Sequence, residues 1–119
     1  MKNPKFQLYK DNRGEYRFRL LAVNGQNILH SSEGYTTKQN CQNAISSVKL
    51  NARNDHRYLR KNAVNQQFYF TFHATNGKVL AMSEMYSSSY ARENGVIAVK
   101  RDAPIAPVED LSFKLRLHR

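Results

Sequence analysis

The fold is decided by a stretch of sequence that occurs twice: NAISSVKLNA at residues 43–52 and NGVIAVKRDA at residues 94–103. The two segments lie fifty-one positions apart and share four identical residues, with several conservative changes between them. A duplicated unit has to bury the same apolar face in each copy, and each copy can do so against the other. The sequence therefore predicts one structure made of two equivalent halves.

The duplication extends upstream of these segments. SEGY at residues 32–35 corresponds to SEMY at residues 83–86, and the Asn-Gly pair at 24–25 corresponds to the pair at 76–77. The offset is fifty-one in the first case and fifty-two in the second, so the first copy is one residue longer in between. Because a slip of one residue turns every side chain of a strand to the other face, we expect a β-bulge in the first copy.

Each copy is predicted to contain three strands before its helix. In residues 16–22, Tyr, Phe, Leu and Ala alternate with two arginines and a leucine, which is the period of a strand with one buried face. Asn-Gly pairs supply the positive-φ residues of tight hairpin turns. The predicted strands are residues 6–10, 16–22 and 26–31 in the first copy, and 57–61, 68–74 and 78–82 in the second.

A helix is predicted to follow each set of strands. Thr36 with Gln39 matches a capping box, and apolar residues then recur at spacings of three and four as far as Ala52. The second helix is expected over residues 88–102 with Ser87 as its cap, and Gly95 inside it suggests close packing.

A final strand is predicted after the second helix. Pro104 and Pro107 cannot continue a helix, and apolar residues then alternate with polar ones over residues 111–117. With one apolar stripe on each helix and one apolar face on each long strand, the economical arrangement is a two-layer α+β domain. We expect one antiparallel sheet with both helices on the same face and an internal two-fold.

Length and composition are consistent with this arrangement. The chain has 119 residues, which suits a single domain over 1–119, with repeat one at about 5–55 and repeat two at about 56–118. Cys41 is the only cysteine, so it has no partner within the chain for a disulfide. Without an apolar leader or a membrane-spanning stretch, we expect a soluble, cytoplasmic monomer that does not bind membranes.

The charge is strongly basic. Nineteen Lys and Arg residues against nine Asp and Glu residues give a formal net charge of +10, which raises the affinity of a small domain for any polyanion. No block of five or more basic residues occurs, so a positive surface has to be assembled by the fold.

Several segments resemble the YegP-like family of small bacterial proteins. They are FQLYKD at residues 6–11, GEYRFRL at 14–20, SEGY at 32–35 and NAISSVK at 43–49, and the resemblance covers essentially the whole chain. It implies tandem β(3)-α-β repeats in one sheet with exchanged C-terminal strands, as in a dimer of single repeats fused into one chain. It implies no established activity.

One side of the predicted sheet is free of helices, and alternation indicates which side chains it presents. Cations interleaved with aromatic rings can bind single-stranded nucleic acid, because rings stack on bases while Arg and Lys meet phosphates. The candidate polyanion-binding residues are Tyr9, Arg17, Arg19, Tyr69, His73, Lys114 and Arg116. The same residues are also typical of a solvated antiparallel face, and the face could instead dock another protein, for example as a stress-related accessory module.

The sequence favours a protein that is not an enzyme and needs no cofactor or metal. The four histidines are scattered without metal-ligand spacing. Cys41 lies in an apolar stripe, which favours a core residue over a nucleophile. Glu33 and Glu84 occupy equivalent places before the helices, but nothing in the sequence brings them together as a catalytic pair.

Overall fold

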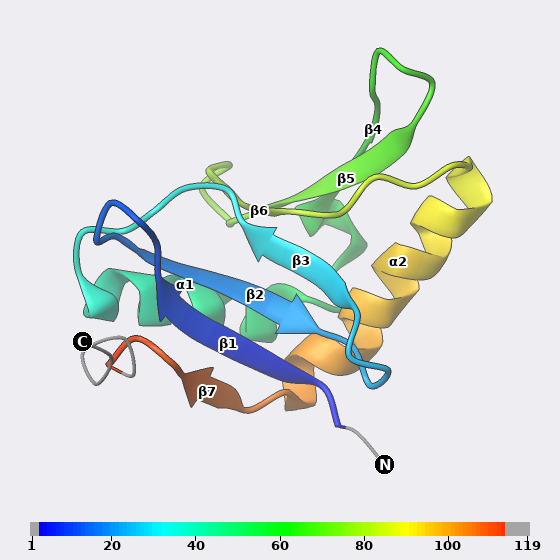
Figure 1. Cartoon of the computed structure of the whole chain (residues 1–119). Helices are drawn as coiled ribbons and strands as arrows, with labels where there is room; N and C mark the ends of the chain where they lie inside the picture. Colours follow the sequence, from blue (N-terminus) through cyan, green and yellow to red (C-terminus); the bar gives the residue numbers. More distant parts are fainter. Residues whose placement is uncertain (1–2, 114–119) are drawn as a thin grey trace.

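Seven strands form one sheet in the computed structural model, which describes residues 3–113 (Figure 1). The strands are β1 (Lys5–Lys10), β2 (Tyr16–Leu21), β3 (Asn27–Ser31), β4 (Tyr58–Asn62), β5 (Phe68–His73), β6 (Val79–Met82) and β7 (Val108–Asp110). The helices are α1 (Lys38–Asn51) and α2 (Ser89–Asp102), followed by the short 3-10 turns η1 (Asp55–Arg57) and η2 (Ala103–Ile105). Across the sheet the order is β4-β5-β6-β3-β2-β1-β7.

Both helices pack on the same face of this sheet, as predicted. One row of neighbouring side chains crosses six strands on that face, and all of its members are buried: Tyr58, Phe72, Ala81, Ser31, Phe18 and Leu8. The helices contribute Ile45, Val48, Val96 and Val99 to the same core. The α+β architecture is therefore confirmed, with a single core between one sheet and two helices.

The two repeats meet at the middle of the sheet. His30 pairs with Met82 and Ser31 pairs with Ala81 where β3 and β6 run antiparallel to each other. The strands of each repeat then extend outward, so that β4 forms one edge of the sheet and β7 lies beyond β1 at the other (Figure 1). Since β7 follows α2 of the second repeat yet pairs with β1 of the first, the two repeats are interlocked.

The last strand differs from the prediction in position and direction. It comprises Val108–Asp110 and pairs parallel to β1, so the sheet is mixed and not antiparallel throughout. Leu111, Ser112 and Phe113 are not in a strand, and the remainder of the predicted strand lies outside the described residues. Backbone bonds from Phe6 N to Pro107 O at 2.8 Å and from Leu111 N to Leu8 O at 2.7 Å determine where the strand forms.

Both helix caps lie one residue later than predicted. Thr37, not Thr36, caps α1 and accepts from the backbone N of Asn40, while Ser88, not Ser87, caps α2 and accepts from the backbone N of Ala91. The two caps are fifty-one positions apart and therefore equivalent. Gln39 does not complete a capping box, because its amide donates to Asn43 Oδ1 at 2.9 Å.

The extra residue of the first repeat is also not where we expected it. The β2–β3 register shifts between Leu20 and Leu21, and the β5–β6 register shifts at the equivalent place, so both repeats carry the same bulge. Ser31 Oγ accepts from the backbone N of Phe18, just as Ser83 Oγ accepts from the backbone N of Phe70. Ser31 is therefore the equivalent of Ser83, and the inserted residue is Ser32, after β3.

Gly95 shows the close packing that its position in a helix suggests. A Cβ on this residue would clash with the phenol group of Tyr86. No helix in residues 3–113 has the length and apolar character needed to cross a membrane.

Candidate polyanion-binding face

The face of the sheet opposite the helices, here called the open face, carries a second row of side chains. It runs across six strands through Leu59, Thr71, Met82, His30, Arg19 and Gln7. Alternation along each strand places Tyr9, Arg17, Lys61, Tyr69 and His73 on the same side. The open face therefore holds every described member of the predicted set, and Lys114 and Arg116 lie outside the described residues.

At the first-repeat end of the open face, Tyr9 and Arg17 are cross-strand neighbours. The guanidinium of Arg19 lies 4.4 Å from the centre of the Tyr9 ring and donates to Gln7 Oε1 at 2.8 Å. Arg17 forms an ion pair with Asp11 at 2.7 Å, and this hydrogen bond holds the pKa of the Asp11 carboxyl below its usual value. Arg17 is thus neutralised, whereas Arg19 has no carboxylate partner among the described residues.

At the second-repeat end, Lys61 and Tyr69 are cross-strand neighbours. Lys61 aligns with Tyr9, and Tyr69 aligns with Arg17, so the cation and the aromatic ring have exchanged places between the two repeats. Lys61 makes no ion pair within residues 3–113. It was absent from the predicted set, although the hairpin register opposite Tyr69 could have identified it.

His73 is the least available member of the set. Its Nε2 lies 2.8 Å from Thr71 Oγ1 and its Nδ1 lies 3.2 Å from the carbonyl oxygen of Gly77. Both ring nitrogens therefore have partners within the chain. His73 therefore has no free ring nitrogen for a ligand.

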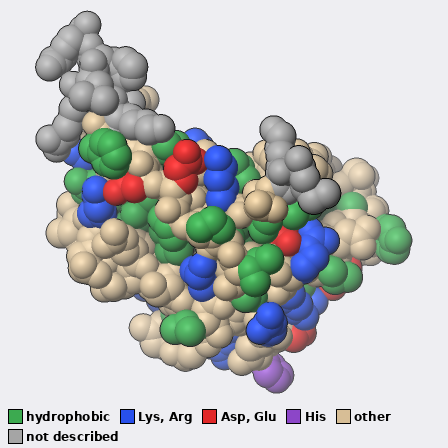
Figure 2. Space-filling model, turned by 90° about the horizontal axis from the view of Figure 1, so that it is seen from below, with side chains coloured by type: hydrophobic (Ala, Val, Ile, Leu, Met, Phe, Trp, Pro, Cys, Tyr) green, Lys and Arg blue, Asp and Glu red, His purple; other side chains and the backbone are tan. Residues whose placement is uncertain are grey.

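Positive charge is spread over the molecule and partly neutralised. All nine acidic residues lie within residues 3–113, and eight of them pair with a Lys, Arg or His side chain. Figure 2, which shows the molecule from below relative to Figure 1, presents Lys and Arg side chains separated by hydrophobic, neutral and acidic ones. On the side that Figure 2 shows, the basic side chains do not form a continuous surface.

The side chains considered for catalysis are either buried or ion-paired within the fold. Cys41 is buried, and desolvation raises the pKa of its thiol to about 12, which removes the reactive thiolate at neutral pH. Glu33 pairs with Lys78 at 3.0 Å and Glu84 with His30 at 3.3 Å. In the part of the chain that the structure describes, no three His, Cys, Asp or Glu side chains are grouped as metal ligands.

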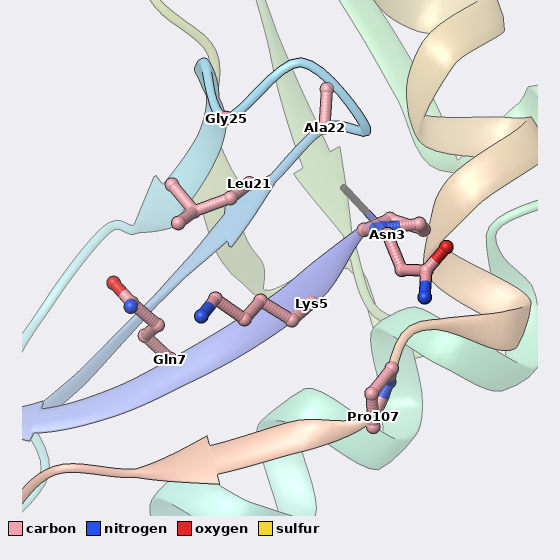
Figure 3. Close-up of a pocket in the computed structure, with 8 residues that line it drawn as sticks. Asn3, Lys5, Gln7, Leu21, Ala22, Gly25 and Pro107 are labelled. Atoms are coloured by element: carbon pink, nitrogen blue, oxygen red, sulfur yellow. The ribbon is translucent and has the colours of Figure 1, made fainter. Parts of the chain in front are cut away.

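The surface hollows occur in equivalent pairs, which reflects the internal two-fold. One pair lies at the outer ends of the sheet: a hollow of about 470 Å³ at Lys5, Gln7 and Leu21 (Figure 3), and one of about 270 Å³ at Arg57, Leu59 and His73. The other pair lies between the helix of one repeat and the hairpin of the other. Asn43 lines one of these grooves, and Asn94 lines its equivalent.

Comparison with known proteins places this geometry in a family. A model described as "Domain of unknown function (DUF1508)" matches twice, at residues 11–58 and 63–110, so each match begins about six residues later than the repeat boundaries expected from the sequence. The chain is 45% identical over 106 residues to the "UPF0339 protein in ptx operon 5'region" of Stutzerimonas stutzeri, covering 89% of this chain and 95% of that protein. It is 38% identical over 105 residues to the UPF0339 protein YegP of Escherichia coli K12, covering 88% and 94%.

Solved structures agree with the sequence relatives. The solution NMR structure of a UPF0339 protein from Shewanella oneidensis matches with a TM-score of 0.89 at 34% identity, covering 98% of both chains. That of E. coli yegP, titled a protein of unknown function, matches with a TM-score of 0.87 at 36% identity, covering 94% of this chain and 96% of that one. With both repeats matched and the fold shared end to end, the chain belongs to the DUF1508 family, as a tandem-repeat member related to the UPF0339 protein YegP.

Proposed function

We propose that the open face binds single-stranded nucleic acid or another polyanion, weakly and with little sequence selectivity. The observation that carries this proposal is the presence of a cation beside a tyrosine ring at each end of a face that no helix covers: Arg19 lies 4.4 Å from the centre of the Tyr9 ring, and Lys61 is the cross-strand neighbour of Tyr69. Each pair combines a ring that can stack on a base with a cation that can meet a phosphate.

The spacing of the two pairs suits an extended strand. Tyr9 and Tyr69 are four inter-strand steps apart across the sheet and four residues apart along the strand direction, which corresponds to roughly 23 Å between their Cα atoms. A strand laid diagonally from β1 across β2, β3 and β6 to β5 would reach both. Between the pairs lie His30 and Met82. The Glu84 carboxylate lies 3.3 Å from His30 Nδ1, so a strand on this path also passes an acidic group, which favours weak binding.

The electrostatics favour weak binding. Arg17 is held by Asp11 and Lys5 by Glu109, which leaves Arg19 and Lys61 as the open-face cations with no acidic partner in the described part of the chain. With about two phosphate contacts, the salt dependence expected for a single strand is shallow: log Kd should rise with log salt with a slope of about 1.4. Stacking, at about 1–3 kcal/mol per base, would supply most of the affinity.

Fluorescence anisotropy with short single-stranded RNA and DNA at two salt concentrations tests the proposal. We expect binding at low salt that weakens at high salt, and weaker binding at low salt in the double variant Arg19→Ala/Lys61→Ala than in the wild type. The matched control is Lys10→Ala/Arg53→Ala, which removes the same charge from outside the open face. No binding at low salt, or equal loss in the two double variants, would contradict the proposal.

A second candidate is docking of another protein on the same face, including a role as a stress-related accessory module. Leu59, at the edge of the open face, is 48% exposed and gives an apolar contact that nucleic acid does not need. Docking predicts a complex from lysate that survives nuclease treatment and is disrupted by Leu59→Lys, whereas oligonucleotide affinity should not fall in that variant.

A further inference from the structure

We propose that the hollow at the outer end of β4 and β5 binds a phosphomonoester. The proposal rests on the proposed function, because the expected source is the 5′-terminal phosphate of a strand lying on the open face. This hollow, here called the Arg57 pocket, has a volume of about 270 Å³ and is lined by His56, Arg57, Tyr58, Leu59, His73, Ala74, Thr75 and Gly77.

The guanidinium of Arg57 is held in position without being neutralised. Its Nη1 donates to the carbonyl oxygen of Ala74 at 2.9 Å. Its Nε is buried and has no hydrogen-bond partner, and the side chain makes no ion pair within residues 3–113. Buried donors are normally satisfied, and a planar guanidinium matches the oxygens of a phosphate. A bound phosphate would supply acceptors that this part of the chain lacks.

No carboxylate competes for Arg57 in the pocket. Asp55 is two residues away in sequence, but its oxygens pair with Arg60 at 3.0 Å and Lys100 at 2.8 Å. The titratable side chains that line the pocket are Arg57, Tyr58, His56 and His73. The Tyr58 hydroxyl donates to the carbonyl oxygen of Ala52 at 2.6 Å, so it is engaged elsewhere. The pocket is therefore cationic or neutral on every side.

In the equivalent hollow of the first repeat, an acidic residue neutralises the cation. Lys5 and Gln7 correspond to Arg57 and Leu59, and in Figure 3 their side chains extend to the same side of β1. Lys5 Nζ lies 3.0 Å from Glu109 Oε1, and Gln7 Nε2 donates to the same oxygen at 3.0 Å. Glu109 is on β7, which pairs with β1, whereas β4 is an edge strand with no such neighbour. Of these two hollows, the Arg57 pocket is therefore the one whose cation has no acidic partner in residues 3–113.

The Arg57 pocket is continuous with the open face. Leu59 and His73 belong to both, and Tyr69 lies four residues before His73 on β5, roughly 13 Å along the strand. A base stacked on Tyr69 and a terminal phosphate in the pocket can thus belong to one strand. Free phosphate and a small phosphorylated molecule share the same chemistry, so the experiment has to separate these sources.

The test compares one oligonucleotide with a 5′-phosphate and with a 5′-hydroxyl, using anisotropy. We expect the 5′-phosphate to tighten binding at least about threefold, because charge-assisted bonds to phosphate are the strong ones. Arg57→Gln should abolish this gain and leave the 5′-hydroxyl affinity unchanged. Lys5→Gln, at the equivalent position, is the matched control and should retain the gain. An absent gain, or one lost equally in both variants, would overturn the proposal.

A titration with inorganic phosphate alone tests the Arg57 pocket independently of the proposed function. In wild-type protein, phosphate should shift the NMR signals of the His56 ring and the Arg57 side chain, and Arg57→Gln should lose the His56 shift. If these signals move while neither oligonucleotide binds, the pocket stands and the open-face proposal fails. If phosphate moves neither signal, the pocket is wrong, whatever the oligonucleotides do. Arg57→Lys, which keeps the charge without the planar fork, replaces Arg57→Gln should that variant not fold.

Discussion

The two outer ends of the sheet come from the same repeated sequence but are built from different chemistry. On β1 one inward position is Leu8, which is fully buried in the core. The equivalent position on β4 is Arg60, which lies 3.0 Å from Asp55 and 2.9 Å from Glu93. The difference follows from the neighbour strand: β7 covers β1, whereas β4 has no strand beyond it.

This comparison shows that a strand's neighbours decide what its inward positions can hold. An edge strand offers unpaired backbone groups to other chains, and charged side chains are a common protection against that pairing. Arg60 with its acidic partners, together with Lys61, supplies such charges on β4, while β1 is protected by β7 and can keep an apolar residue. The same difference leaves Arg57 free and Lys5 neutralised.

The largest expected effect is the difference in the free energy of unfolding between the variants Leu8→Ala and Arg60→Ala. Leu8→Ala should reduce the free energy of unfolding by about 2–5 kcal/mol, since it opens a cavity in a packed core. Arg60→Ala removes partly exposed ion pairs and should cost about 1 kcal/mol or less. Urea denaturation of the two variants measures both values, and equal losses would show that the two ends are not as different as described.

A smaller loss of stability, in serine-to-alanine variants, tests which serines of the two repeats are equivalent. Ser31→Ala and Ser83→Ala should each cost about 1–3 kcal/mol, because each leaves a buried backbone N–H of a neighbouring phenylalanine without its acceptor. Ser32→Ala, which removes an exposed bond to the carbonyl oxygen of Val79, should cost about 0.5 kcal/mol or less. If thermal or urea unfolding ranked Ser32 above Ser31, Ser32 would be the true equivalent of Ser83.

The smallest expected effect is the pH dependence of stability that Asp55 contributes. Hydrogen bonds from Arg60 and Lys100 lower the pKa of Asp55 from its usual 3.8 to about 2. A carboxyl with a lowered folded-state pKa contributes stability above its unfolded pKa and loses it as the pH falls through the folded value. The stability difference between wild type and Asp55→Asn should therefore be present at pH 6 and vanish between about pH 4 and pH 2.

Because Asp55 is largely exposed, this difference should stay below about 1 kcal/mol at pH 6. Asn3, at the equivalent position of the first repeat, has no charge to lose, so Asn3→Ala serves as a control with no such pH dependence. A wild-type advantage that persisted at pH 2 would show that Asp55 acts through something other than its charge.

Much of the fold could be predicted from the sequence because local signals agree with the final structure. The alternation of Tyr16, Phe18 and Leu20 and the Asn-Gly turns determine where the hairpins form, and the helical stripe from Cys41 to Val48 determines which face each helix buries. The helix-free face and most of its candidate residues follow from the same alternation.

What could not be predicted depends on contacts between distant segments. Leu111, Phe113 and Leu115 alternate as a strand would, yet β7 forms at Val108–Asp110, where two acidic residues make a poor local strand. Pairing with β1 and the bonds of Glu109 to Gln7 and of Asp110 to Lys38 outweigh local propensity there. Sequence also cannot tell which cations are neutralised, as Arg17 is by Asp11 and Lys61 is not.

The most direct test of the central claim is an NMR titration of labelled protein with a short single-stranded oligonucleotide. We predict that backbone amide shifts concentrate at Tyr9, Arg19, Lys61 and Tyr69 on the open face, while Leu50 and Ile97 on the exposed sides of the helices stay unchanged. Shifts confined to the helices, or no shifts at millimolar oligonucleotide and low salt, would contradict the account.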